Sequence, residues 1–194
     1  MKVIGLTGGI AVGKSVATDH LSKKFNIPII DADAITHQLL TPDNPVYHQM
    51  IKLFGKDILT KDGTINRNAI ADKIFSDSKL RQKYEKLIHP LILTEIDCEV
   101  AKYRAQDIAR VIVSATLILE LNLQKRFDLL IVILSKPEIQ IERLTNVRGL
   151  SRQQAQQRLD AQWTNEQRLK VKGAQLIWNN NSKEHFESQL AKLF

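Results

Sequence analysis

One segment limits what this chain can fold into more than any other feature: residues 8–15 read G-G-I-A-V-G-K-S, which fits the pattern G-x-x-x-x-G-K-S. The apolar run Val3–Leu6 precedes it, and Ala17, Leu21 and Phe25 follow at helical spacing. Strand, glycine-rich loop and helix form the context in which this motif binds phosphate oxygens with backbone N–H groups at the positive end of a helix. The segment therefore predicts a nucleotide phosphate site.

The fixed positions of this phosphate loop, residues 8–15, have separate chemical roles. Glycines let the backbone approach the phosphates, Lys14 reaches the β- and γ-phosphates, and the Ser15 hydroxyl binds Mg²⁺. The predicted nucleotide-binding residues of this region are Gly8, Gly9, Ile10, Ala11, Val12, Gly13, Lys14, Ser15 and Val16.

Composition narrows the class of protein. The net charge is +7, but the basic residues are spread along the chain with few aromatic residues, so we expect phosphate-rich small ligands and no nucleic acid partner. The sequence contains no run of apolar residues that is long enough to predict a membrane span. The chain leads from Met1 directly into the first strand, which leaves no room for a signal peptide, and the single cysteine, Cys98, cannot form an internal disulfide. These features favour a cytoplasmic protein.

Short apolar runs alternate with helical patterns, which predicts an α/β fold with a parallel sheet. The candidate strands are Val3–Leu6, Ile27–Ile30, Val111–Val113, Leu129–Leu134 and Leu176–Trp178. All but the first are apolar with little alternation, as expected for strands that are buried on both faces.

The longest region without a convincing strand, residues 34–109, has helical patterns. Pro90 is expected to end a helix there, because proline removes a backbone donor. Further along, Pro137 and Gly149 suit the start and the end of a helix, and Ser151 begins a capping box for the next one. That next helix has a thin apolar stripe and is expected to be poorly buried and mobile, as a lid would be.

A second set of chemical groups follows the run Ile29-Ile30. Asp31 and Asp33 stand at the carboxyl end of a predicted strand, where ligands bind in open parallel sheets. Residues two apart on an extended chain point the same way, so both carboxylates are expected to face the phosphate loop. One would orient the metal and the other would accept a proton from an acceptor hydroxyl. The alternative is that one of them caps the following helix.

With these features in place, the chain resembles the dephospho-CoA kinase family along nearly its whole length. Its Leu87-Ile88-His89-Pro90 matches the rather specific Ile-x-His-Pro signature of that family. The other matching positions are Ile4–Ile10, Asp31-Ala32-Asp33, Gly63, Arg67, Phe75, Leu117, Glu120, Gln140, Arg143, Gly149-Leu150-Ser151, Arg158, Gln162, Arg168, Ile177 and Asn179.

The resemblance implies a P-loop kinase fold: a five-stranded parallel sheet flanked by helices, with a helical substrate-binding insertion and a helical lid. On this basis we expect a single P-loop kinase chain over residues 1–194. Its core would comprise residues 1–34, 108–140 and 173–194, its substrate-binding region residues 35–107, and its lid residues 141–172.

The resemblance also implies an activity: transfer of the γ-phosphoryl group of ATP to the ribose 3′-hydroxyl of dephospho-CoA, the last step of coenzyme A synthesis, with Mg²⁺. Asp33, Lys14 and Arg143 would be catalytic, with Arg143 facing the phosphates as the lid closes. Arg148 and Asn179 would join the ATP site, and Ser15 and Asp31 would hold the metal. The acceptor site would comprise Asp31, Asp33, His37, Arg67, His89 and Glu120.

The chain departs from the usual family pattern at six positions: Ala11, Val12, His37, Thr116, Val147 and Ala174. The first two replace Gly-Ser in the phosphate loop. A Cβ at residue 11 is strained if that residue has a positive φ, and Val12 adds a stiff branch. Val147 stands where a lid arginine is expected, and Arg148 beside it is a candidate substitute.

Several alternatives stay open on sequence alone. The chain could be a P-loop kinase for a nucleoside or nucleotide acceptor, a nucleotide-binding protein with lost or reduced turnover, or a nucleic-acid NTPase, which only the charge suggests. Its arginines could be solvated helix faces, Glu120 a structural partner and Asn179 part of a turn. We expect a monomer or a weak homo-oligomer.

Overall fold

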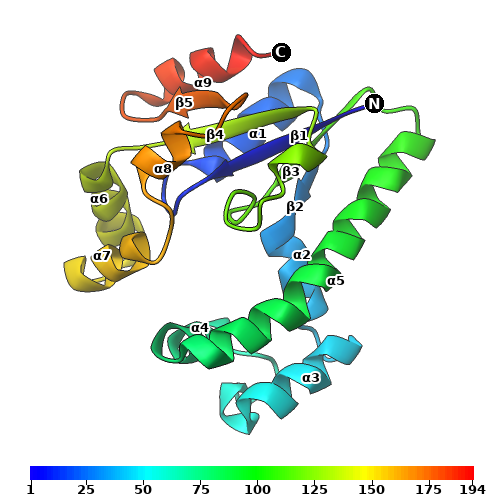
Figure 1. Ribbon diagram of the computed structural model, residues 1–194, viewed down its shortest axis with the longest axis vertical. Helices are drawn as coiled ribbons and strands as arrows, with labels where there is room; N and C mark the ends of the chain where they lie inside the picture. Colours follow the sequence, from blue (N-terminus) through cyan, green and yellow to red (C-terminus); the bar gives the residue numbers. More distant parts are fainter. The chain divides into compact units, whose positions relative to one another are not determined.

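The computed structural model describes residues 1–194, except for the side chain of Phe75, so the predicted contribution of that side chain lies outside the described residues. The chain forms two compact units (Figure 1). Unit 1 comprises Met1–Ile30 and Lys102–Phe194, and unit 2 comprises Asp31–Ala101. Unit 2 is therefore an insertion in the sequence of unit 1.

Across the described residues, a five-stranded sheet has the order β2-β3-β1-β4-β5. Its strands are β1 (Lys2–Gly8), β2 (Ile29–Asp31), β3 (Arg110–Ser114), β4 (Leu129–Leu134) and β5 (Gln175–Trp178). β1 is paired in parallel with both β3 and β4, and β4 in parallel with β5. The sheet and its flanking helices confirm the predicted fold class. The second strand begins two residues later than predicted, after Pro28.

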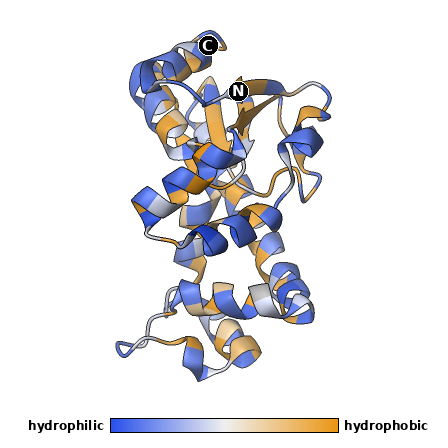
Figure 2. Ribbon diagram, turned by 90° about the vertical axis from the view of Figure 1, so that its left-hand side faces the viewer, coloured by the Kyte–Doolittle hydropathy of each residue, from blue (hydrophilic) through white to orange (hydrophobic). Residues whose placement is uncertain are grey.

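Apolar side chains cover both faces of the sheet, and the strands are largely orange in the hydropathy view (Figure 2). Along β4 the faces alternate: Ile131 and Ile133 join the cluster under α1 (Lys14–Phe25) and α9 (Lys183–Ala191), whereas Leu130 and Val132 join a second cluster. That second cluster packs against the segments around residues 115–127 and 163–176. Burial on both faces explains why these strands lack a polar–apolar alternation in sequence.

The remaining elements of unit 1 are η2 (Gln124–Arg126), α6 (Pro137–Arg148), α7 (Arg152–Asp160) and α8 (Asn165–Leu169). The three α-helices among them have local signals at their ends. Gly149 ends α6 with a φ of 65°, and Ser151 and Gln154 form the predicted capping box of α7. As expected, α7 is mostly exposed, with Ala155 as its buried residue. The segment that follows is better packed, because Arg168 is only 4% exposed and Trp163 packs on the second cluster.

Unit 2 is built from helices. They are α2 (Ala32–Leu39), α3 (Pro45–Phe54), η1 (Lys56–Ile58), α4 (Arg67–Ser76) and α5 (Ser78–Ala105), whose last residues lie in unit 1. Asn44 and Asn66 cap α3 and α4 by accepting backbone N–H hydrogen bonds. An isolated antiparallel bridge joins Leu59 to Ile65.

Pro90 does not end a helix as predicted; it lies inside α5, which runs for 28 residues. Apolar side chains on both sides of it, Ile88 and Ile96, are buried and hold the helix in place before and after the proline. Pro90 is exposed, so water can satisfy the carbonyl of Lys86 that loses its donor. Tertiary packing therefore overrides the local signal, and His89 is a mid-helix residue.

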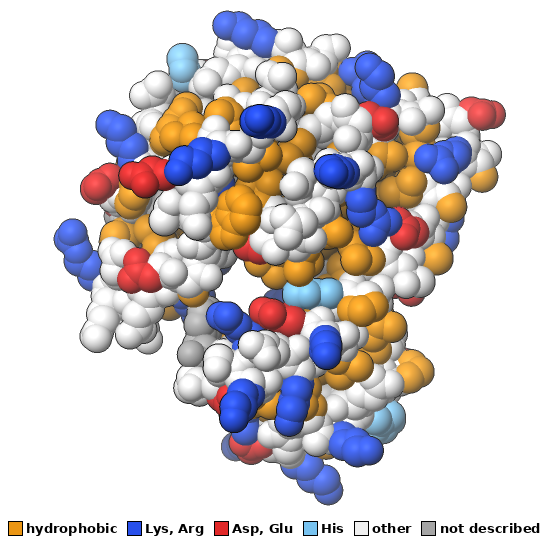
Figure 3. Space-filling view, in the orientation of Figure 1, with side chains coloured by type: hydrophobic (Ala, Val, Ile, Leu, Met, Phe, Trp, Pro, Cys, Tyr) orange, Lys and Arg blue, Asp and Glu red, His pale blue; other side chains and the backbone are white. Residues whose placement is uncertain are grey.

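The surface is consistent with the composition. On the face in Figure 3, Lys and Arg side chains are scattered among neutral and apolar groups. Cys98 is exposed on α5 as a free thiol. Among the described residues, no helix combines the length and the apolar character that crossing a membrane requires.

The close approach of two side chains to Gly5 of β1 gives a first prediction. A Cβ at Gly5 would lie 2.8 Å from the Phe127 ring and 3.0 Å from Leu130 Cδ1. Gly5→Ala should therefore lower the free energy of unfolding by about 1–3 kcal/mol in denaturant titrations, because the core is overpacked. Phe127→Leu should restore part of that loss in the double variant. Equal stability of Gly5→Ala and wild type would contradict the packing described.

Candidate active site

The phosphate loop has an unusual backbone at three positions. Gly8 has a φ of 155° and Gly13 a φ of 99°, and Ala11, which is not glycine, has a φ of 57°. A Cβ at Gly8 would lie 2.4 Å from the carbonyl oxygen of Ile133, so only glycine fits there. The left-handed conformation of Ala11 costs about 1–2 kcal/mol. Other contacts must therefore hold the loop in this shape.

Those contacts are hydrogen bonds to three consecutive loop carbonyls. Gln140 Nε2 donates to Ile10 O at 2.6 Å, Arg143 Nη1 donates to Ala11 O at 3.0 Å, and Asn179 Nδ2 donates to Val12 O at 2.8 Å. Peptide groups are trans and planar, so the carbonyl of each residue and the N–H of the following residue point in opposite directions. Fixing the three carbonyls on one side of the loop directs the N–H groups of residues 11–13 to the other side.

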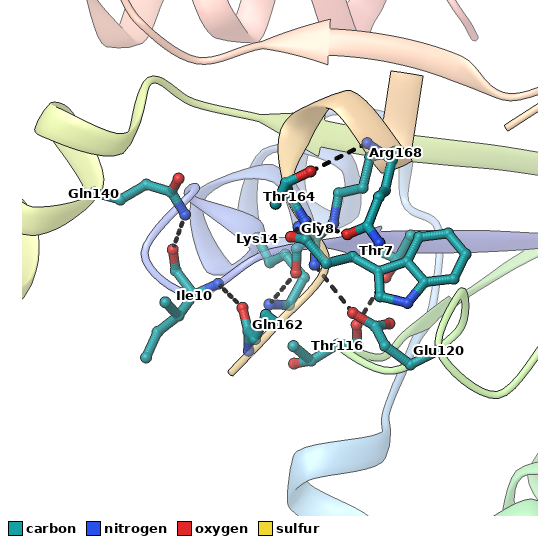
Figure 4. A network of polar contacts seen from close by, with 12 residues as sticks. Thr7, Gly8, Ile10, Lys14, Thr116, Glu120, Gln140, Gln162, Thr164 and Arg168 are labelled. Carbon is teal, nitrogen blue, oxygen red and sulfur yellow. Dashed lines mark hydrogen bonds and ion pairs between the residues drawn. The ribbon is translucent and has the colours of Figure 1, made fainter. Parts of the chain in front are cut away.

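The segment between α7 and α8 also reaches the loop (Figure 4). Gln162 Oε1 accepts a hydrogen bond from Ile10 N at 2.8 Å, so two glutamines bind both backbone polar groups of Ile10. A Cβ at Gly9 would lie 3.2 Å from Gln140 Nε2 and 3.4 Å from Gln162 Oε1. An added Cβ at position 9 would therefore fit only if the Gln140 amide moved by a few tenths of an ångström.

The loop continues directly into the first turn of α1. Lys14 opens α1, and its Nζ donates to Gly8 O at 3.3 Å across the loop. Ser15 is exposed in the same turn, and Val16 packs at the edge of the core. An ammonium group, a hydroxyl group and the N-terminus of a helix thus meet at the loop, which suits a phosphate group with a bound cation.

A buried ion pair lies next to the loop. Arg168 Nη2 donates to Glu120 Oε1 at 3.1 Å, and its Nη1 donates to the carbonyl of Trp163. Burial lowers the pKa of the Arg168 guanidinium, and the charge of Glu120 opposes this shift. Glu120 Oε2 is buried without a hydrogen-bond partner. Glu120, predicted as an acceptor-site residue, is thus paired with Arg168, which is not a solvated residue.

The aspartate pair of unit 2 differs from the predicted geometry. Asp31 is the N-cap of α2, and its Oδ1 accepts from Asp33 N at 2.9 Å. Asp33 lies in the first turn of that helix, so the prediction that both carboxylates share one face of an extended strand is wrong. The cap satisfies the N–H group of Asp33 in the first turn of the helix. Both carboxylates are exposed, as is His37 further along α2.

Electrostatics connect other predicted residues of unit 2. Burial raises the pKa of the Tyr84 hydroxyl; the charge of Arg67 opposes this shift, and those of Glu85 and Asp33 add to it. Burial also lowers the pKa of His89, which Glu85 opposes. Asp33 and Arg67 are thus each close enough to Tyr84 to affect its pKa.

Other predicted site residues have defined places in unit 1. Arg143 and Asn179 bind loop carbonyls, and Arg148 is exposed at the end of α6. One of the departures from the family pattern fits the structure, because Val12 is buried in the core under the loop. The Thr7 hydroxyl donates to the backbone carbonyl of Thr116 at 3.2 Å, a contact that proline would also allow. Val147 is 81% exposed.

Sequence reasoning gave no site role to Gln140, Gln162, Arg168 or Tyr84. The first three appear only among the positions that match the family pattern, and Tyr84 is not singled out. A signal for Tyr84 was present, because it is the one residue with a polar group in the stripe formed with Leu80, Leu87 and Ile88. The glutamine contacts depend on residues more than a hundred positions away, which no local pattern shows.

The fold and the site together define a class of protein. A parallel sheet with a phosphate loop after its central strand, and with Lys14-Ser15 at the start of the following helix, is the arrangement of a P-loop kinase. The dephospho-CoA kinase family model matches residues 2–185. The chain belongs to the dephospho-CoA kinase family.

Relatives and solved structures agree with this assignment. A dephospho-CoA kinase of Geobacter sulfurreducens is 32% identical over 194 residues, covering 100% of this chain and 98% of that protein. One of Lactobacillus johnsonii is 38% identical over 159 residues, covering 82% of this chain and 80% of that protein. The dephospho-CoA kinase structure from Campylobacter jejuni has a TM-score of 0.68 at 25% identity, covering 98% of this chain and 94% of that one. A Thermus thermophilus crystal structure shares the fold, with a TM-score of 0.82 at 24% identity, covering 99% of this chain and 95% of that one.

The ion pair beside the loop generates a stability prediction. Arg168→Met leaves the partly buried carboxylate of Glu120 without its partner, so the free energy of unfolding should fall by about 1–3 kcal/mol. Adding Glu120→Leu should recover most of this loss, because apolar pairs often replace buried ion pairs at no net cost. Denaturant titrations of the two variants give the comparison. A double variant no more stable than Arg168→Met would contradict the pairing.

The half-buried His89 generates a pH prediction. Its folded-state pKa is lowered, so below the ordinary histidine pKa of about 6.5 the unfolded state binds more protons. The stabilisation from neutral His89 is complete above that pH and is lost as the pH falls towards the folded-state pKa. Between about pH 7.5 and about pH 5.5, wild type should lose more unfolding free energy than His89→Gln. Equal losses in both proteins would show that His89 does not titrate in this way.

Proposed function

We propose that this protein transfers the γ-phosphoryl group of ATP to the ribose 3′-hydroxyl of dephospho-CoA, forming coenzyme A and ADP. One observation supports nucleotide binding in this proposal. Hydrogen bonds hold the carbonyls of Ile10, Ala11 and Val12 on one side of the loop, which leaves a row of N–H groups on the opposite side. Such a row recognises phosphate oxygens. Membership of the dephospho-CoA kinase family supports the choice of acceptor.

The nucleotide would be held by unit 1. In this proposal Lys14 neutralises charge on the β- and γ-phosphates, and the Ser15 hydroxyl contributes one oxygen ligand to Mg²⁺. Among the described residues no cluster of three or more His, Cys, Asp or Glu side chains is arranged to hold a metal. This fits Mg²⁺ bound mainly by phosphate oxygens, as the ion commonly is in kinases. The cation would neutralise the charge that develops on the transferred group.

The acceptor would be bound by unit 2. Its site includes Arg67 and His89, and Arg67 supplies a positive charge suited to the phosphates of dephospho-CoA. Asp33 is exposed at the start of α2 and accepts the proton of the 3′-hydroxyl in this proposal. The Oδ1 atom of Asp31 accepts the capping hydrogen bond, so its Oδ2 atom is the one that would orient water around the metal. His37, on the same helix, would contact the acceptor.

An assay of ADP release with a panel of acceptors tests the proposed function. The expected result is turnover with dephospho-CoA and none with nucleosides or nucleotides. Lys14→Ala, which removes the phosphate contact, should cut turnover sharply while its thermal midpoint stays near that of wild type. Turnover on a nucleoside alone would reassign the acceptor. ADP binding without turnover on any acceptor would instead indicate a nucleotide-binding protein without kinase activity.

A substitution at Asp33 tests the assignment of the base. Asp33→Asn keeps the shape of the side chain but removes the proton acceptor, so kcat should fall about 100- to 10,000-fold, with little change in the affinity for ATP. Steady-state kinetics with dephospho-CoA measure both quantities. An unchanged kcat would transfer the role to another group, and Asp31→Asn is the next variant to measure.

A further inference from the structure

Arg143 lies on the outer side of the phosphate loop. Its Nη1 donates to Ala11 O at 3.0 Å and its Nη2 donates to Asn179 O at 3.1 Å. Because the Ala11 carbonyl and the Val12 N–H point in opposite directions across a trans peptide, a group bound to that carbonyl lies opposite the N–H side of the loop. The contacts of Arg143 are thus on the face away from the phosphates, although the sequence predicted a catalytic contact.

The carbonyl that Arg143 binds belongs to the strained residue of the loop. Ala11 has a φ of 57°, a conformation that glycine adopts freely and alanine does not. A free loop with alanine there would relax to other conformations and lose the alignment of its N–H groups. A hydrogen bond from a charged donor to the Ala11 carbonyl opposes that relaxation.

Arg143 also supports a second loop contact through Asn179. The backbone carbonyl of Asn179 accepts from Arg143 Nη2 and from Ser135 Oγ, while its side-chain Nδ2 donates to Val12 O. Asn179 is 6% exposed and therefore has little freedom to move. One guanidinium group thus joins the two neighbouring carbonyls of the loop, one directly and one through Asn179.

We infer that Arg143 is a positioning residue of the nucleotide site: its planar fork holds Ala11 in the left-handed conformation and so keeps the loop N–H groups aligned for the phosphates. This inference rests on the proposed function for its ligand. It assigns Arg143 to binding of the α- and β-phosphates that ATP and ADP share, rather than to the transferred group. Lysine would replace it poorly, because a single ammonium group lacks the fork.

Binding of ADP to the full-length protein distinguishes the two roles, because ADP lacks the transferred group. Arg143→Ala should weaken ADP binding about 10- to 100-fold in calorimetric titrations, while kcat at saturating ATP falls by less. Arg143→Lys should have an intermediate effect and serves as the second variant if the alanine variant does not fold. Arg152→Ala, an exposed arginine at the start of α7, is the matched control and should bind ADP as wild type does.

The strained alanine offers a rescue experiment. Ala11→Gly removes the need for an external contact, so it should restore several-fold of the lost ADP affinity in the Arg143→Ala background. Unchanged ADP affinity in both Arg143 variants, with a large fall in kcat, would overturn the inference and return Arg143 to the transferred phosphoryl group. Wild type that binds ADP but does not phosphorylate dephospho-CoA would reject the proposed function, while the ADP titrations would still test Arg143.

Discussion

The set of hydrogen bonds onto the carbonyls of Ile10, Ala11 and Val12 is the interaction on which the rest of the structure depends. Glycines at positions 8 and 13 permit the shape of the loop, but they do not select it. The selection comes from Gln140, Arg143 and Asn179, which lie far along the sequence on α6 and after β5. The sheet order places α6 and the end of β5 beside the loop, so the shape of the site depends directly on the fold.

The two units divide the chemistry between them. Unit 1 concentrates backbone N–H groups, Lys14 and Ser15 around one loop, whereas unit 2 carries exposed carboxylates on α2 together with Arg67 and the half-buried Tyr84 and His89. The long helix α5 contributes both of the latter side chains. Because Pro90 is accommodated within that helix, the signature containing His89 lies in the middle of α5 and not at a helix end.

Local signals predicted the elements whose limits are set by neighbouring residues. β4 matches its prediction at both ends, and α6 begins at Pro137 and ends before Gly149 as expected. The errors arise where local signals compete or where distant residues decide. At Asp31 a capping hydrogen bond replaces the predicted strand geometry. In α5 tertiary packing outweighs the tendency of Pro90 to end a helix. The buried Arg168 is paired with Glu120, which lies 48 residues away in the sequence. The phosphate loop was predictable, and Arg143 and Asn179 were predicted at the nucleotide, but their hydrogen bonds to the loop carbonyls were not.

The order in which the chain is synthesised determines when these contacts to the loop can form. The glycine-rich loop leaves the ribosome early, but Asn179 follows more than 160 residues later. Until then a nascent chain has no partner for the Val12 carbonyl and no complete scaffold around Ala11. The contact that fixes the Val12 carbonyl therefore forms only after β5 has been synthesised, and not while the amino-terminal half of the chain emerges alone.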